Sequence, residues 1–139
     1  MSAVAARTLL RSHPEKPAHA DVIGRCIAAC YDCVEACTMC ADACLSERDV
    51  PHLVACIRLD LDCAAACEAT GSILSRSNKN GHRQLLEAQL ATCIAFCRAC
   101  AGECAVHAEM HRHCRICAEA CTACAAACND MLAAMRMPG

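Results

Sequence analysis

The sequence is short of aromatic side chains: its 139 residues include one Phe, one Tyr and no Trp. Four Pro and five Gly are too few for a disordered or fibrous chain. A formal net charge of −2 offers no attraction to nucleic acid or to an anionic membrane surface. No apolar run approaches the roughly 20 residues that cross a bilayer. These absences disfavour nucleic-acid and membrane partners. The length of the chain fits one compact domain.

Cysteine takes the place of the missing bulky residues. Eighteen of the 139 residues are Cys, and Cys and Ala together supply most of the 57% of residues that are apolar. A core is normally built from bulky aliphatic and aromatic side chains. The composition therefore predicts that thiols fill much of the interior.

The first twenty residues decide how those cysteines are interpreted. Arg7 and Arg11 flank only Thr8, Leu9 and Leu10, so the apolar stretch of about 7–15 residues found in signal peptides is missing. We therefore expect a cytoplasmic protein, whose thiols stay reduced. In that compartment clustered cysteines usually bind metal or take part in catalysis, whereas a secreted chain would use them as a disulfide scaffold.

Four alanine-rich segments follow, at about residues 18–47, 51–76, 82–109 and 111–135. The charged run 46–49, with Pro51 suited to the first turn of a helix, ends the first segment, and the turn cluster 77–81 ends the second. No segment alternates like a strand. Short connections imply antiparallel neighbours, so we predict an all-α fold, an up-down-up-down four-helix bundle over residues 18–139.

Residues 1–17 precede this bundle as an N-terminal extension. Residues 2–12 could form a short amphipathic helix, after which Pro14 and Pro17 mark a linker. A frayed tail is the alternative.

The decisive feature is the spacing of the cysteines. Within a segment, successive cysteines lie three or four residues apart, except for one step of seven in the second segment. They are Cys26, Cys30, Cys33, Cys37, Cys40, Cys44, Cys56, Cys63, Cys67, Cys93, Cys97, Cys100, Cys104, Cys114, Cys117, Cys121, Cys124 and Cys128. Such steps put side chains on the one helix face that meets partner helices. The four stripes should therefore point inward and line an axial column, about 27 Å long in the first helix.

Cu(I) binding explains this column better than structural cysteines, disulfides, iron–sulfur clusters or zinc sites do. Alanine would pack as well as a structural cysteine without its risk of oxidation, and disulfides need Cβ atoms closer than i,i+4 neighbours provide. Iron–sulfur and structural zinc sites take fewer cysteines, from short runs or turns. One Cu⁺ per thiolate would neutralise the column, whereas unpaired buried thiolates are prohibitive. Without metal the buried thiols should be protonated, so metal binding would release protons.

The pattern C-x3-C-x2-C-x3-C-x2-C-x3-C runs from Cys26 to Cys44 and returns in shorter form at Cys93–Cys104 and Cys114–Cys128. Over about residues 18–135 the chain closely resembles the bacterial copper storage proteins. The resemblance implies four-helix bundles that assemble as a homotetramer, each bundle holding many Cu(I) ions. Because no signal peptide is visible, the chain looks like the cytosolic branch of that family.

One end of the bundle carries histidines. The stripe of the third segment continues to His107 and His111, and His113 adjoins the first cysteine of the fourth segment, with His52 and Met110 expected nearby. Imidazole and thioether both suit copper. We interpret the three histidines as outer ligands through which Cu(I) is taken up. Solvated histidines around a tight loop are the alternative.

The other end is expected to be a hydrophobic plug. The stripes continue there as Ile23, Leu74, Leu86, Leu90, Met131 and Met135. The two methionines could be weak Cu(I) ligands or ordinary core residues.

Asp60 is the exception among the stripes. Between Cys56 and Cys63 either Leu59 or Asp60 can face inward. An inward Asp60 would place a hard carboxylate among soft ligands, where it could bind an outlying ion or hold a proton. Tyr31 lies outside the cysteine stripe, either at a subunit contact or on the surface.

We therefore predict a protein that is not an enzyme but stores or sequesters Cu(I), near one ion per cysteine. A copper chaperone or acceptor protein is the expected partner. The first alternative is a thiol or copper redox enzyme, although no low-pKa cysteine beside a base stands out. The second is a zinc buffer in the manner of metallothionein.

Overall fold

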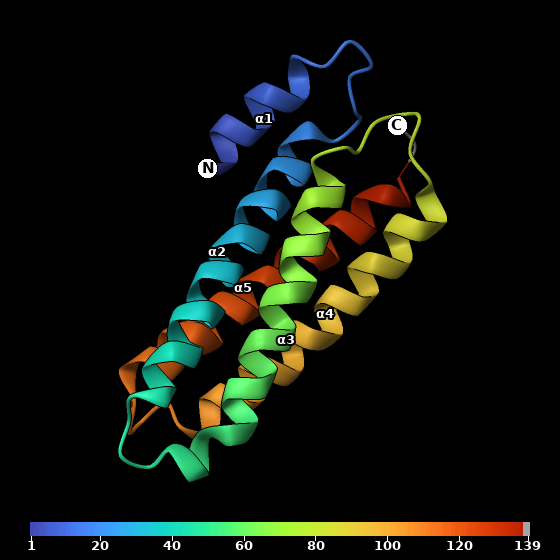
Figure 1. Cartoon of the computed structure of the whole chain (residues 1–139). Coiled ribbons are helices and arrows are strands. Elements are labelled where there is room, and N and C mark those ends of the chain that lie inside the picture. Colours follow the sequence, from blue (N-terminus) through green and yellow to red (C-terminus); the bar gives the residue numbers. More distant parts are fainter. Residues whose placement is uncertain (138–139) are drawn as a thin grey trace.

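The computed structural model describes residues 1–137, and within that range it contains five helices and no strand. They are α1 (Ala3–Arg11), α2 (Ala20–Leu45), α3 (Val50–Leu74), α4 (Arg83–Val106) and α5 (Arg112–Met135). Helices α2 to α5 run alternately up and down, and α1 lies beside α2 (Figure 1). The predicted all-α bundle and its extra N-terminal helix are confirmed, and the frayed tail is excluded.

Local sequence explains where several helices begin and turn. The hydroxyl of Ser2 caps α1 by accepting a hydrogen bond from the Ala5 amide at 3.1 Å. Pro51 lies in the first turn of α3, where a missing amide hydrogen costs nothing. Between α3 and α4, the Asn80 amide donates to the side chain of Asn78 at 2.9 Å, which tightens the turn. The short loops keep successive helices antiparallel.

The four long helices form a closed ring, in which α2 packs on α3, α3 on α4, α4 on α5 and α5 on α2. By length and hydropathy alone, α4 and α5 also match membrane-spanning helices. Much of that hydropathy comes from Ala and Cys, and all the cysteines of both helices are buried in the bundle. The interior of the ring is therefore where the sulfur atoms gather.

Helix α1 packs on the outside of this ring, against α2. Gly24 permits the close approach, since a Cβ there would lie 2.9 Å from the carbonyl oxygen of Ala3. Leu10 is buried at the contact, with 6% of its surface exposed. Asp21 pairs with Arg7 at 3.2 Å across the edge. The N-terminal extension is thus attached to the bundle by a backbone-to-backbone contact with an ion pair at its rim.

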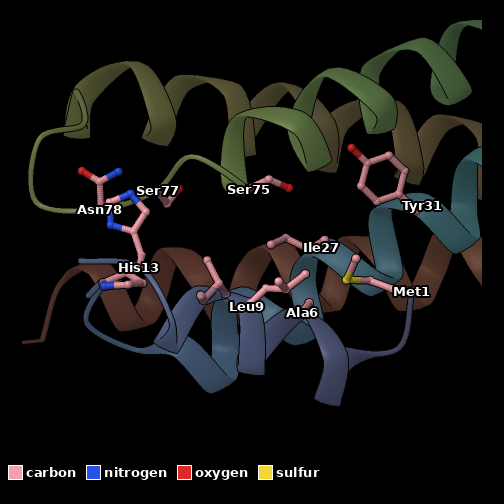
Figure 2. Close-up of a pocket in the computed structure, with 11 residues that line it drawn as sticks. Met1, Ala6, Leu9, His13, Ile27, Tyr31, Ser75, Ser77 and Asn78 are labelled. Carbon is pink, nitrogen blue, oxygen red and sulfur yellow. The ribbon is translucent and has the colours of Figure 1, made fainter. Parts of the chain in front are cut away.

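A cavity of about 490 Å³ remains between α1, α2 and the chain at the end of α3 (Figure 2). Leu9 and Ile27 contribute to its apolar wall, and Tyr31 lies at one side of it. The ring of Tyr31 rests on Gly71 of α3, where a Cβ would lie 2.9 Å from the ring atom Cε2. Tyr31 therefore packs within the chain, between α2 and α3, rather than lying free on the surface.

Apolar side chains close the end of the bundle at which α2 and α4 begin. Ile23, Leu74, Leu90 and Met131 each expose 4% of their surface or less. Met135 is partly buried against them, as is Leu86. The predicted hydrophobic plug is confirmed, and a hollow of about 940 Å³ lies beside it, lined in part by Leu86, Met131 and Met135.

Replacing Gly24 by Ala should loosen α1, because the new methyl group would collide with the backbone of Ala3. We expect a loss of about 1–3 kcal/mol in the free energy of unfolding, as for other overpacked sites. Denaturant unfolding and amide hydrogen exchange over residues 3–11 would measure it.

Gly102→Ala is the matched control, since nothing lies within 4 Å of a Cβ at that helix position. It should stabilise the protein by about 0.5–1 kcal/mol. Similar effects of the two substitutions would contradict the proposed role of Gly24.

Candidate metal centre

All eighteen cysteines point into the bundle. None exposes more than 1% of its surface, and all are free thiols. They lie between residues 26 and 128, within the part of the chain that the structure describes. The four inward stripes predicted from the spacing are confirmed, and together they form one sulfur column along the bundle axis.

Sulfur atoms in this column approach one another both across and along helices. The Sγ atoms of Cys56 and Cys104 are 3.4 Å apart, those of Cys37 and Cys121 are 3.6 Å apart, and those of Cys33 and Cys37 are 3.8 Å apart. A metal–thiolate bond of about 2.3 Å puts two sulfurs of one ion roughly 3.8–4.6 Å apart, from tetrahedral to linear geometry. Small movements would therefore suffice to place ions between neighbouring thiols.

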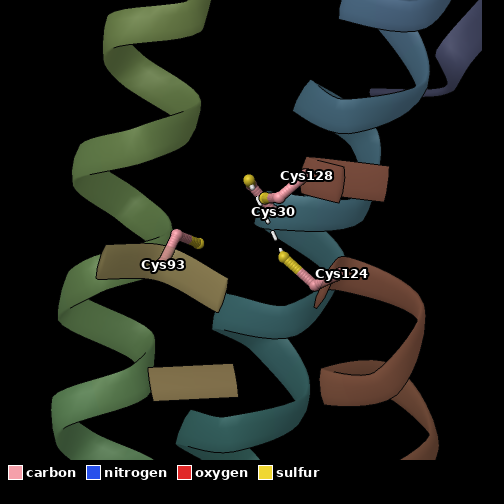
Figure 3. Close-up of side chains that lie close together, drawn as sticks. All are labelled: Cys30, Cys93, Cys124 and Cys128. Atoms are coloured by element: carbon pink, nitrogen blue, oxygen red, sulfur yellow. Dashed lines mark hydrogen bonds between the residues drawn. The ribbon is translucent and has the colours of Figure 1, made fainter. Parts of the chain in front are cut away.

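Groups of four ligand atoms, all within 4.8 Å of one another, recur along the column. Four of these groups are Cys30, Cys93, Cys124 and Cys128; Cys33, Cys63, Cys67 and Cys97; Cys33, Cys37, Cys63 and Cys121; and Cys37, Cys100, Cys117 and Cys121. Figure 3 shows the first, with Cys30 on α2, Cys93 on α4 and two members on α5. Because neighbouring groups share Cys33, Cys37 or Cys121, one thiolate can bridge two ions.

The spacing of the cysteines could not show which helices contribute to the same group. Each of the four groups draws on three helices, and the third also includes Cys33 and Cys37, which are neighbours along α2. The metal-binding capacity of the column therefore depends on how the helices are packed and on their register.

Asp60, and not Leu59, fills the inward position in the stripe of α3. Its side chain is fully buried, whereas Leu59 is only partly buried. The Oδ1 atom lies 3.2 Å from the Sγ atoms of Cys100 and Cys117 and 3.4 Å from that of Cys104. Burial away from water raises the pKa of Asp60 from 3.8 to about 9. At neutral pH the metal-free protein therefore keeps a proton on this carboxyl group.

Burial also raises the pKa of two thiols at the end of the bundle where α2 and α4 finish. Desolvation raises the pKa of Cys114 to about 12 and the pKa of Cys44 further still. An enzyme's reactive cysteine has a lowered pKa and an accessible sulfur. Neither of these thiols meets that description, and both are fully buried.

His113 completes the column at the end where α2 and α4 finish. Its Nδ1 atom lies 3.4 Å from the Sγ of Cys40, 3.6 Å from that of Cys114 and 3.9 Å from that of Cys44. These four residues form a further four-ligand group. The other ring nitrogen, Nε2, is buried and has no hydrogen-bond partner. The site thus offers one imidazole and three thiols to a single soft ion.

His111 lies against His113 but is engaged by carboxylates. Its Nδ1 is 2.6 Å from Oε2 of Glu47 and its Nε2 is 3.2 Å from Oδ2 of Asp49. The hydrogen bond from His111 lowers the pKa of Asp49. The two imidazole rings are stacked, with centroids 5.3 Å apart and an interplanar angle of 21°. Sequence reasoning assigned no role to Glu47 and Asp49, which look like ordinary turn residues until the loops are brought together.

His107 lies at the same end, with its Nε2 3.5 Å from Oε2 of Glu103. The side chains of His107 and His111 are only 15% and 10% exposed, so these rings are not simply solvated. Met110, in contrast, is 74% exposed, and His52 is also exposed. We call the end that carries His107, His111 and His113 the histidine mouth.

The fold and the site define a class of protein: a helical metal store, whose bundle encloses many near-equivalent soft ligands. The chain belongs to the copper storage protein family, Csp, whose family model matches residues 19–133. It is a non-enzymatic store for many Cu(I) ions, as predicted.

Solved structures support this assignment. The copper storage protein Ccsp from Streptomyces lividans, loaded with 10 copper equivalents, has a TM-score of 0.88 and 46% identity over 93% of this chain and 98% of that one. A second structure of that cytosolic protein, with five coppers, has a TM-score of 0.79 and 50% identity over 81% of this chain and 93% of that one. Cu(I)-bound BsCsp3 has a TM-score of 0.67 and 39% identity over 76% of this chain and 93% of that one.

A curated relative is also similar. The uncharacterized cysteine-rich protein YhjQ of Bacillus subtilis (strain 168) is 39% identical over 108 residues, which are 78% of this chain and 94% of that protein.

Replacing Asp60 by Asn should stabilise the metal-free protein at neutral pH. The folded state holds a proton on Asp60 up to about pH 9, whereas the unfolded chain releases it near 3.8, so stability from this group falls as pH rises between those values. The amide of the variant cannot ionise, and the gain has an upper bound of roughly 4 kcal/mol at pH 7.

Anaerobic denaturant unfolding of the reduced protein between pH 5 and pH 9 would measure the gain, in buffers chosen at about one-unit steps. Asp62→Asn, on the exposed face of the same helix, is the control and should change little. A gain from D60N that does not grow with pH would contradict the proposed protonation.

Proposed function

We propose that the eighteen buried thiolates themselves hold the stored Cu(I), at close to one ion per cysteine. The observation that carries this proposal is the series of overlapping four-sulfur groups, beyond which Cys26 still contacts Cys128 and Cys56 still contacts Cys104 through sulfur. Soft thiolates prefer Cu(I) among the common cellular metals. Copper is the cargo of this protein and not a cofactor of any reaction.

Charge balance favours a monovalent ion. Burial disfavours the thiolates of Cys44 and Cys114, so these two thiols are neutral in the metal-free state. Each Cu⁺ that binds displaces one proton, so the column stays neutral while it fills. Zn²⁺ would neutralise the same thiolates at half the number of ions, but it requires four ligands around each one.

The histidine mouth is proposed as the site of copper uptake. His113 shares a four-ligand group with Cys40, Cys44 and Cys114, the outermost thiols of the column. The opposite end is closed by the hydrophobic plug. His107 and His111 lie outside His113 and are proposed to pass ions to it. Asp60 is proposed as an additional oxygen ligand for an ion held by Cys100 and Cys117.

We also propose a cellular location, an oligomeric state and protein partners. A cytosolic location fits eighteen free thiols and the description of the S. lividans relative. Assembly as a homotetramer, implied by the family resemblance, is supported by exposed apolar side chains such as Met39 and Leu61. A copper chaperone or acceptor protein would deliver or collect the ions.

An anaerobic titration of the reduced protein with Cu(I), competed against a chromophoric chelator, tests the proposed capacity. We expect saturation near 18 ions per chain, one per cysteine. Saturation at a few ions would contradict the proposal. A parallel zinc titration with equal stoichiometry and affinity would instead favour zinc buffering.

Replacing His107, His111 and His113 together by Ala tests the mouth. Copper loading from a weak chelator should slow, because the outer ligands that receive each ion are gone, while the capacity falls by only a few ions. Stopped-flow absorbance of the copper–thiolate bands would follow the loading. His82→Ala, an exposed histidine at the other end, is the control. Unchanged loading kinetics in the triple variant would reject uptake at this end.

A further inference from the structure

We propose that Glu47 and Asp49 are positioning residues of the histidine mouth: they hold His111 as a closed latch over His113, and Cu(I) passes when His111 leaves them. The latch rests on the proposed uptake of copper at this end. Glu47 and Asp49 are not proposed copper ligands, but in this proposal they control how fast copper is loaded.

Both nitrogens of the His111 ring lie close to carboxylate oxygens. Carboxylates only accept hydrogen bonds, and each ring nitrogen of His111 faces one, at 2.6 Å to Glu47 and 3.2 Å to Asp49. Neither ring nitrogen is therefore turned toward an arriving ion, so His111 cannot receive Cu(I) while both carboxylates hold it.

The three residues of the latch come from the two loops at this end of the bundle. Glu47 follows α2, Asp49 directly precedes α3 and His111 directly precedes α5. One histidine side chain thus ties the two loops together. The acidic side chains are about one-third exposed, at 33% and 29%, so water competes for their hydrogen bonds and the pairs can open readily.

The latch covers the inner histidine. The ring of His111 is stacked on that of His113, and Nε2 of His113 is buried without a partner. The Nδ1 of His113 already faces the thiols of Cys40, Cys44 and Cys114. An ion arriving from solvent therefore meets His111 before it can reach a free nitrogen of His113. Opening of the latch uncovers His113 and frees the His111 ring at the same time.

The test compares two double variants that remove the same charge. Glu47→Gln with Asp49→Asn breaks the latch, and Glu35→Gln with Asp42→Asn removes two exposed carboxylates of α2 that face solvent. Each double variant removes two carboxylates from the protein. Loading of the reduced full chain with Cu(I) from a weak chelator is followed anaerobically by stopped flow, and the capacity is titrated separately.

We expect the latch variant to load about five-fold faster than the control variant, because two partly exposed contacts to His111 are lost together. The capacity of both variants should equal that of the unchanged protein. Loading at the control rate, or more slowly, would overturn the latch, since slower loading would mean that the carboxylates deliver the ion. A low capacity in the unchanged protein would instead count against the proposed storage function.

A spectroscopic readout separates positioning from a general loss of structure. Nuclear Overhauser contacts between the ring protons of His111 and His113 should be present in the metal-free unchanged chain and weaker in the latch variant. Absence of these contacts from the unchanged chain would overturn the proposal. Asp49→Asn alone, whose side chain makes no cap hydrogen bond to α3, serves if the double variant does not fold.

Discussion

The rest of the structure depends on the burial of the thiols. A thiol enters an apolar interior at little cost, but a thiolate does so only when a cation compensates its charge. A column of protonated thiols is therefore neutral, and one Cu(I) for each thiolate would keep it neutral. The same ring of helices can hold protons or ions, because the sulfur separations in the metal-free protein are already close to those that a bound ion requires. Packing and cargo binding thus use one set of side chains.

Charged groups are distributed accordingly. Within the column the one ionisable oxygen side chain is Asp60, and its raised pKa keeps it neutral like the thiols around it. Ionised carboxylates and histidines meet instead at the histidine mouth, where Glu47 and Asp49 retain contact with water. The opposite end is closed by Ile23, Leu74 and other apolar side chains. Charged side chains therefore gather at one end of the bundle and apolar side chains at the other.

Much of this could be predicted because the signals are periodic. Steps of three and four between cysteines place them on one face of each helix. Helices that must bury such a face pack against one another, and a bundle is the simplest fold in which they do so. The histidine mouth followed from counting along the helices. Asp60 could not be assigned in advance, since Leu59 also fits the stripe and only the rotation of α3 decides between them. Tyr31 was left open for a similar reason, because its partner is Gly71 on another helix.

Helical period and ligand chemistry are local properties, so the class of fold, the inward direction of the thiols and the soft, monovalent cargo could all be predicted from the amino-acid order. Which thiols lie together depends on helix packing, because each of the four groups described above joins three helices. The tertiary structure also brought Glu47 and Asp49 to His111, 62 residues beyond Asp49 in the chain. Contacts between loops that are distant in sequence have no periodic signature, so they emerge only when the helices are packed.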